Sequence, residues 1–66
     1  MTPADLRTWQ ARMGYTQPAA AEALGMSVSG YKDLALGVRR ATGKHIEQID
    51  RRTALACAAI EAGIVV

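Results

Sequence analysis

The residues best suited to chemistry in this chain are cations, and most of them lie in its second half. Six of the eight Lys and Arg residues follow residue 30, and no acid lies between Gly37 and His45. Clustered cations attract phosphate groups, because they raise the local positive potential. The alternative is an ordinary solvated loop, and charge alone does not decide between the two. The six cations are Lys32, Arg39, Arg40, Lys44, Arg51 and Arg52.

Residue types that carry catalysis or bind metals are scarce. The chain has one cysteine, Cys57, and one histidine, His45. A structural zinc site normally takes four ligands, so no metal is expected. The sequence shows no carboxylate pair and no glycine-rich phosphate loop. It therefore predicts a protein that is not an enzyme and holds no cofactor. Cys57 is expected to pack inertly in a helix, and His45 to lie at the surface or contact a phosphate.

Length and composition favour one small helical domain over residues 1–66. Alanine is abundant and phenylalanine is absent among the 66 residues. A domain of this size buries only about 60% of the surface that its unfolded chain exposes, so efficient helix packing or a second subunit is expected. No apolar run is long enough to span a bilayer, and the N-terminus lacks the order of a signal peptide. We expect a cytoplasmic protein without membrane contact.

The stretch from Thr16 to Gly37 is predicted to form two short helices joined by a tight turn. Thr16 and Ser27 are good N-cap residues, because their hydroxyls accept hydrogen bonds from the first backbone amides of a helix. Gly25 lies where the first helix must end, and Gly37 closes the second. Together these features indicate a helix-turn-helix. The apolar positions are Ala20, Ala21, Leu24, Val28, Tyr31, Leu34 and Ala35.

Two further helices are expected to flank this stretch. The first begins at Thr2-Pro3-Ala4-Asp5, a cap followed by proline and an acid, and it ends at Gly14. Its apolar spacing places Trp9 in the core, with surface contact to a partner as the alternative. The last helix follows Asp50 and ends at Gly63, with an apolar face of Leu55, Ala56, Ala59 and Ile60.

The segment between the third and last helices is predicted to be irregular. Residues 38–43 are expected to form a loop, and Ile46 and Ile49 a short helical turn. The fold class that follows is all-α, a compact bundle of about four or five helices. The apolar end of the chain, within a tail at 62–66, needs cover from its own core or from a second subunit. The expected subunit contacts are Ile60, Ile64, Val65 and Val66.

Residues 5–40 resemble the helix-turn-helix of the phage-repressor and Cro type, the XRE-like family with a lambda-repressor-like fold. The resemblance begins at Gly14-Tyr15-Thr16-Gln17, continues through Ala21 and the turn Leu24-Gly25-Met26-Ser27, and ends at Gly37. Each piece is common by itself, and the ordered set at fixed spacing carries the resemblance. It implies binding to double-stranded DNA, with residues 28–36 as the recognition helix in the major groove.

The resemblance also implies roles for individual residues. Gln17 would contact a DNA phosphate and brace the recognition helix. Arg39, Arg40 and Lys44 would bind phosphates beyond that helix. Four residues would read the bases. Ser29, Lys32 and Asp33 would form hydrogen bonds with base edges, and Val28 would make an apolar contact.

Two positions depart from the family pattern. Many members pair a glutamate, at the position of Ala35, with a basic residue on the first helix, here assigned to Gln10. Both halves of that pair are therefore expected to be missing. Asp33 would repel phosphates unless it reads a base or bonds to a neighbour such as Lys32.

The function expected from the sequence is a small transcriptional repressor, of the phage, prophage or antitoxin type. It would be nucleoid-associated and would have no small-molecule ligand. It would act as a homodimer on a palindromic operator, because one recognition helix contacts too few base pairs for specific binding. The alternative is a protein-interaction module that keeps the fold without binding DNA. The modest net charge of +2, Asp33 and the apolar tail favour that alternative.

Overall fold

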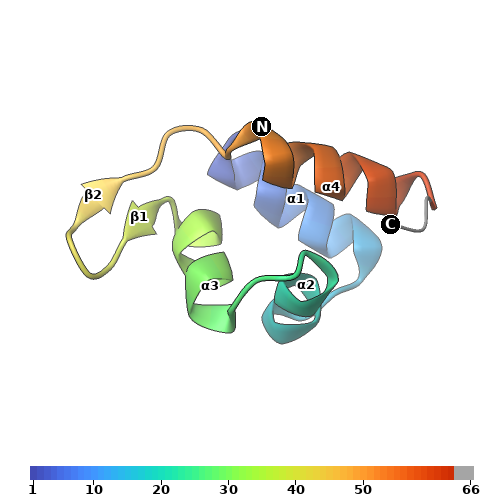
Figure 1. Ribbon diagram of the computed structural model, residues 1–66, viewed down its shortest axis with the longest axis horizontal. Coiled ribbons are helices and arrows are strands. Elements are labelled where there is room, and N and C mark those ends of the chain that lie inside the picture. The colour runs from blue at the N-terminus through green and yellow to red at the C-terminus, as the bar shows by residue number, and fades with distance from the viewer. Residues whose placement is uncertain (64–66) are drawn as a thin grey trace.

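Four helices and one two-stranded antiparallel sheet make up residues 1–63, the part of the chain that the computed structural model describes (Figure 1). The mostly helical class predicted from the sequence is confirmed, and the small sheet is an addition to it. The elements are α1 (Pro3–Met13), α2 (Gln17–Ala23), α3 (Val28–Leu36), β1 (Val38–Arg39), β2 (Lys44–His45) and α4 (Arg51–Glu61).

Each helix begins at the N-cap residue that the sequence indicates. Thr2 and Asp5 form a reciprocal capping box, in which each side chain accepts from the other residue's backbone amide. Ser27 Oγ accepts from Gly30 N at 3.1 Å, and a Cβ at residue 30 would lie only 3.1 Å from that oxygen. The glycine inside α3 therefore leaves room for the cap. The other caps are Thr16 and Asp50.

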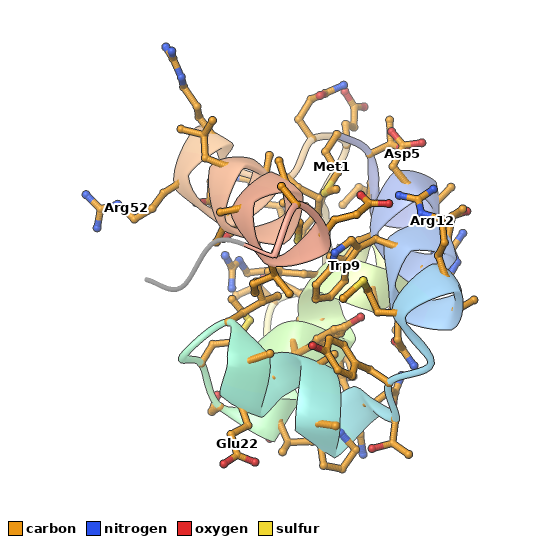
Figure 2. All side chains as sticks on the ribbon, turned by 90° about the vertical axis from the view of Figure 1, so that its right-hand side faces the viewer. Met1, Asp5, Trp9, Arg12, Glu22 and Arg52 are labelled. Atoms are coloured by element: carbon orange, nitrogen blue, oxygen red, sulfur yellow. The ribbon has the colours of Figure 1, made fainter. Side chains whose placement is uncertain are left out.

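The core lies where α1, α2, α3 and α4 meet, and it is centred on Trp9. This side chain is fully buried between α1 and α4, as Figure 2 shows. Its indole Nε1 donates to the carbonyl oxygen of Cys57 at 3.1 Å. Its ring packs edge-on against the ring of Tyr15, with 5.6 Å between the ring centroids. The prediction that Trp9 is a core residue is confirmed. The other buried apolar residues are Leu6, Ala20, Ala21, Tyr31, Leu34, Ala35, Ile49 and Cys57.

The connection between α2 and α3 is short and fixes how the two helices cross. It consists of residues 24–27, with Met26 half-buried against the core. Met26 N donates to the carbonyl of Ala21 at 3.0 Å, which ties the turn back to α2. Figure 1 shows α2 and α3 side by side beneath α1. This arrangement leaves one side of α3 without cover from the other helices.

The prediction of a loop at 38–43 is wrong for Val38 and Arg39, which form a strand, whereas residues 40–43 are the turn of a β-hairpin. Val38 pairs with His45 and Arg39 with Lys44 in an antiparallel register. A further bond of 2.8 Å from Ile46 N to the carbonyl of Gly37 extends the ladder. Gly37 has φ of +83°, a conformation that glycine adopts without strain, and it turns the chain from α3 into β1.

The short helical turn expected at Ile46 and Ile49 is also absent. Residues 46–50 are irregular. Ile49 is buried, and its backbone amide donates to the carbonyl of Met1 at 2.8 Å. The two isoleucines therefore anchor an extended connection to the core and to the N-terminus, a contact that helical spacing alone did not reveal.

The apolar face predicted for α4 is partly wrong. Thr53 and Cys57 are buried, whereas Leu55 is 58% exposed. The Thr53 hydroxyl bonds to Asp50 Oδ1 at 2.7 Å, so a polar residue enters the core with its hydrogen bond satisfied. The side of α4 that meets the core therefore carries Thr53 and Cys57, and the Cys57 carbonyl accepts the bond from Trp9.

The cap of α4 predicts a loss of stability in acid. Hydrogen bonds from the Thr53 hydroxyl and amide lower the pKa of Asp50 below its usual 3.8. A carboxyl with a lowered folded-state pKa stabilises the fold above the unfolded pKa, and this contribution is lost as the pH falls through the folded value. Asparagine also caps helices but does not titrate. Asp50→Asn should therefore make the unfolding free energy, measured by urea titration, depend less on pH between pH 5 and pH 2. An unchanged pH dependence would contradict this role of Asp50.

Candidate nucleic-acid interface

The uncovered side of α3 carries a mixed set of polar and apolar side chains. Ser29 and Lys32 are exposed, and neither makes a side-chain hydrogen bond or ion pair within residues 1–63. Val28 is 37% and Leu36 60% exposed on the same helix. A hydroxyl, an ammonium group and two apolar groups can contact hydrogen-bonding edges and methyl groups of bases. These residues include three of the four predicted as base contacts.

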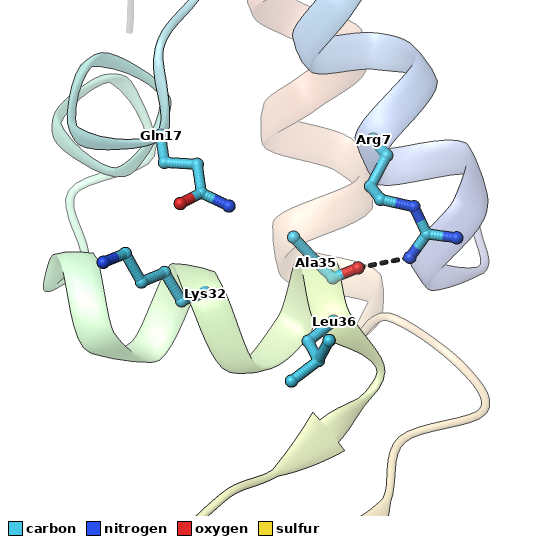
Figure 3. Close-up of a pocket in the computed structure, with 5 residues that line it drawn as sticks. All are labelled: Arg7, Gln17, Lys32, Ala35 and Leu36. Atoms are coloured by element: carbon cyan, nitrogen blue, oxygen red, sulfur yellow. Dashed lines mark hydrogen bonds between the residues drawn. The ribbon is translucent and has the colours of Figure 1, made fainter.

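A groove lies beside this side of α3, between α1, the start of α2 and α3. Figure 3 shows Gln17 and Lys32 facing one another across it, with Arg7 on its far side. Its lining contains two cations and an amide but no acid, and most of the lining surface is apolar. The lining residues are Arg7, Gln17, Lys32, Ala35 and Leu36.

Arg7 is the member of this groove that the sequence interpretation missed. Its guanidinium donates to the carbonyl of Ala35, near the end of α3 where helix carbonyls lack internal partners. A guanidinium has five N–H donors, so others remain available in the groove. No local signal in the sequence marks this residue, because the contact joins two residues that are 28 positions apart.

Gln10, the position that the resemblance gives to a basic residue, bonds to the core and not to Ala35. Gln10 accepts from the Tyr31 hydroxyl at 2.7 Å and donates to the carbonyl of Tyr15 at 3.1 Å. It therefore satisfies a buried phenol, whose pKa is raised by burial. The contact from α1 to Ala35 is made by Arg7, whose guanidinium donates to the Ala35 carbonyl.

Asp33 does not bond to Lys32, the neighbour considered from the sequence. It forms an ion pair with Arg40, at 2.6 Å between Oδ1 and Nε, and its side chain is only 17% exposed. The same arginine donates through its NH2 group to the carbonyl of Ser29 at 3.2 Å. The acid on α3 is thus neutralised from the hairpin, and its side chain is held against the protein.

The remaining cations predicted to bind phosphates lie on the hairpin. Arg39 and Lys44 are exposed and occupy opposite positions of the β1–β2 pair. Neither has an ion-pair partner among residues 1–63, in contrast to Arg40. The hairpin therefore presents two cations outward and turns the third back onto α3.

The predicted subunit contacts are only partly described. Ile60 is half-buried and packs against the chain's own core. Ile64, Val65 and Val66 lie outside the described residues. Their part in a subunit contact stays a prediction.

Features of other site types are few in residues 1–63. Cys57 is buried, and burial raises the pKa of its thiol to about 11. No group of three or more His, Cys, Asp or Glu side chains lies close enough to hold a metal ion in this part of the chain. Likewise, none of the described helices has the length and apolar character needed to cross a membrane.

Comparisons with known proteins leave the geometry as the basis for function. The chain matches no protein-family model, no curated protein and no solved structure. The uncovered side of α3, the groove and the hairpin are therefore the features of this molecule that bear on its function.

Proposed function

We propose that this protein is a sequence-specific regulator of transcription that binds double-stranded DNA through a helix-turn-helix formed by α2 and α3. The observation that carries the proposal is the acid-free groove beside α3, which Arg7, Gln17 and Lys32 line from three helices. A duplex needs both a surface that binds its phosphates and a surface that reads its bases. The groove supplies the first, and the uncovered side of α3 supplies the second.

In this proposal α3 lies in the major groove, as the recognition helix of a phage-repressor or Cro-type domain does. Val28, Ser29 and Lys32 contact base edges, with Lys32 as the donor suited to guanine. Gln17 and the free N–H groups of Arg7 contact a backbone phosphate beside the groove. Asp33 is omitted from the reading set, because Arg40 neutralises its carboxylate at 2.6 Å.

The regulator is proposed to act as a homodimeric repressor. One short helix reads only a few base pairs, which gives too little discrimination within a genome. Two copies related by a two-fold axis would place their α3 helices in successive major grooves, about 34 Å apart. The operator would then be an inverted repeat.

The proposal is tested by a salt series on a labelled duplex of mixed sequence. Fluorescence anisotropy should show binding at 50 mM salt that weakens steeply towards 200 mM, because cations on the protein displace counterions from the DNA. Arg7→Ala, which removes the cation assigned to a backbone phosphate, should lower the slope of log K against log salt by about 1 for each subunit. Arg52→Ala is the matched control, since it removes the same charge, extends into solvent from α4 (Figure 2) and lines no part of the groove.

A second candidate function is a protein-interaction module, and the exposed leucine on α3 favours it. Leu36 is 60% exposed and lies directly beside the groove. Apolar side chains in such positions serve protein contacts as well as DNA contacts. The salt series separates the two functions, because a protein module would show no binding to any duplex at low salt.

A further inference from the structure

The outer side of α4 carries an apolar strip that the rest of the described chain leaves exposed. Leu55 is 58% exposed, and Ala58 and Ala62 are exposed after it. Residues of a helix that are three, four or seven positions apart lie on one side, because each residue turns the helix by about 100°. These three side chains therefore form one continuous strip, with the half-buried Ala59 at its edge.

Two arginines continue this strip at the start of α4. Arg51 and Arg52 lie one turn before Leu55, and both are exposed. Neither forms an ion pair within residues 1–63. Asp50, the neighbouring acid, accepts instead from the hydroxyl and the amide of Thr53. Figure 2 shows Arg52 extending away from the molecule, so its guanidinium is open to a ligand.

The position of these arginines is electrostatically unfavourable for the helix. The N-terminus of a helix carries a partial positive charge, so cations in the first turn destabilise it. The first turn of α4 contains no acid that would offset them. The acid at the other end of α4, Glu61, is held by Arg12 of α1 at 2.9 Å. An external carboxylate would supply the charge that this side of α4 lacks.

The strip and the DNA-binding groove lie on different sides of the molecule. Figure 3 looks into the groove between α1, α2 and α3, and the pale orange ribbon of α4 passes behind these elements. Arg51, Arg52 and Leu55 are not among the residues that line the groove. A ligand on the outer side of α4 would therefore not compete for the groove.

We propose that the outer side of α4 binds an acidic amphipathic helix of another protein. Leu55 inserts between apolar side chains of that helix, and carboxylates at one of its ends pair with Arg51 and Arg52. The alanines let the partner backbone approach closely, at the 8–10 Å between helix axes that is usual for packed helices. The strip from Leu55 to Ala62 is about 10 Å long, which suits about two turns of a bound helix.

The charges of the strip select this occupant over a second copy of the chain. A second copy would present the same two arginines and no acid on its own strip. An acidic helix complements both the cations and the apolar side chains. The inference goes beyond the proposed function and does not depend on DNA binding.

The test begins with a displayed library of random helical peptides, selected on the immobilised full chain. Enriched peptides should share apolar residues at helical spacing and at least two carboxylates near one end. With one such synthetic peptide, Leu55→Ala should weaken binding at least about fivefold, as expected for a central apolar contact. Arg51→Ala/Arg52→Ala should weaken it about 2- to 10-fold, and this loss should shrink as salt screens the ion pairs. Arg39→Ala/Lys44→Ala is the matched control, because it removes the same charge from the hairpin and should leave peptide binding unchanged.

Two further measurements separate binding from folding. Amide chemical shifts in nuclear magnetic resonance spectra should change on peptide addition mainly at residues 51–62. The melting temperature of Arg51→Ala/Arg52→Ala should be no lower than that of the unmodified protein, because the substitutions remove cations from the positive end of α4. A loss of peptide binding in this variant is then a loss of contacts.

Several outcomes would overturn the inference. Enriched peptides that lack carboxylates, or that bind Leu55→Ala and Arg51→Ala/Arg52→Ala as tightly as the unmodified protein, would exclude the strip as an acidic-helix site. Shifts at residues 51–62 that follow protein concentration alone would assign the strip to a second copy. Shifts there on addition of duplex DNA would assign it to phosphates. Failure of the protein to bind any duplex would remove the proposed function and leave this inference intact.

Discussion

Replacing Trp9 with alanine is expected to unfold most of the protein at 25 °C. The side chain has no exposed surface, packs against Tyr15 and donates to the carbonyl of Cys57 on α4. Removing a buried tryptophan typically costs about 3–5 kcal/mol. A domain of this length has a total stability of about 3–10 kcal/mol, at about 0.05–0.15 kcal/mol for each residue. The substitution therefore removes much or all of the stability.

Circular dichroism during urea titration measures this effect. Trp9→Phe keeps an aromatic ring but loses the indole donor, so it should cost less, about 1–3 kcal/mol. Leu55→Ala is the control on α4, because that side chain is 58% exposed and should change stability little. A midpoint of Trp9→Ala close to that of the unmodified protein would show that α1 and α4 do not pack through this residue.

Lys32→Ala is expected to have the largest effect on operator choice. Lys32 lies both on the uncovered side of α3 and in the groove with Arg7 and Gln17. In our proposal it donates to a guanine, and the loss of such a contact costs about 1–3 kcal/mol, or about 5- to 150-fold in affinity. Discrimination should be relaxed at one base pair of each half-site.

Competition among duplexes with single base changes measures this relaxation. Ser29→Ala should alter discrimination at a neighbouring base pair with a smaller loss of affinity. Arg52→Ala is the control, because Arg52 extends into solvent from α4 (Figure 2). If Lys32→Ala leaves affinity and base preference untouched, the reading surface does not include this residue.

The helix starts and the core were predictable because both depend on local chemistry. A hydroxyl or carboxylate at an N-cap bonds to an amide three residues later, so Thr2, Thr16, Ser27 and Asp50 could be recognised from their positions alone. Helical spacing placed Trp9 and Tyr31 inside in the same way.

The hairpin was not predictable because nothing local in its sequence favours a strand. Its strands have two residues each, and among these four residues only Val38 has high β-propensity. It is held from outside, by the bonds of Arg40 to α3 and by the turn at Gly37. Interactions between residues seven and eleven positions apart leave no periodic pattern in the sequence.

The exposed positions of the candidate site were predictable from the sequence, but its supporting contacts were not. Ser29 and Lys32 were placed by their position in the resembling motif, and both are exposed on α3. Arg7 was missed because the resemblance gives it no role. The resemblance matches the basic position of the first helix to Gln10, one turn later. Only the folded arrangement brings the guanidinium of Arg7 to the Ala35 carbonyl, 28 residues away.

Selection of bound duplexes from a random pool tests the central claim, sequence-specific DNA binding through α3, most directly. Our account predicts an enriched inverted repeat whose half-sites are centred about one helical turn, 10–10.5 base pairs, apart. The same selection with Lys32→Ala should return a motif with one base position relaxed in each half. A pool that shows no enrichment at low salt, or a motif that Lys32→Ala and Ser29→Ala both leave unchanged, would contradict the account.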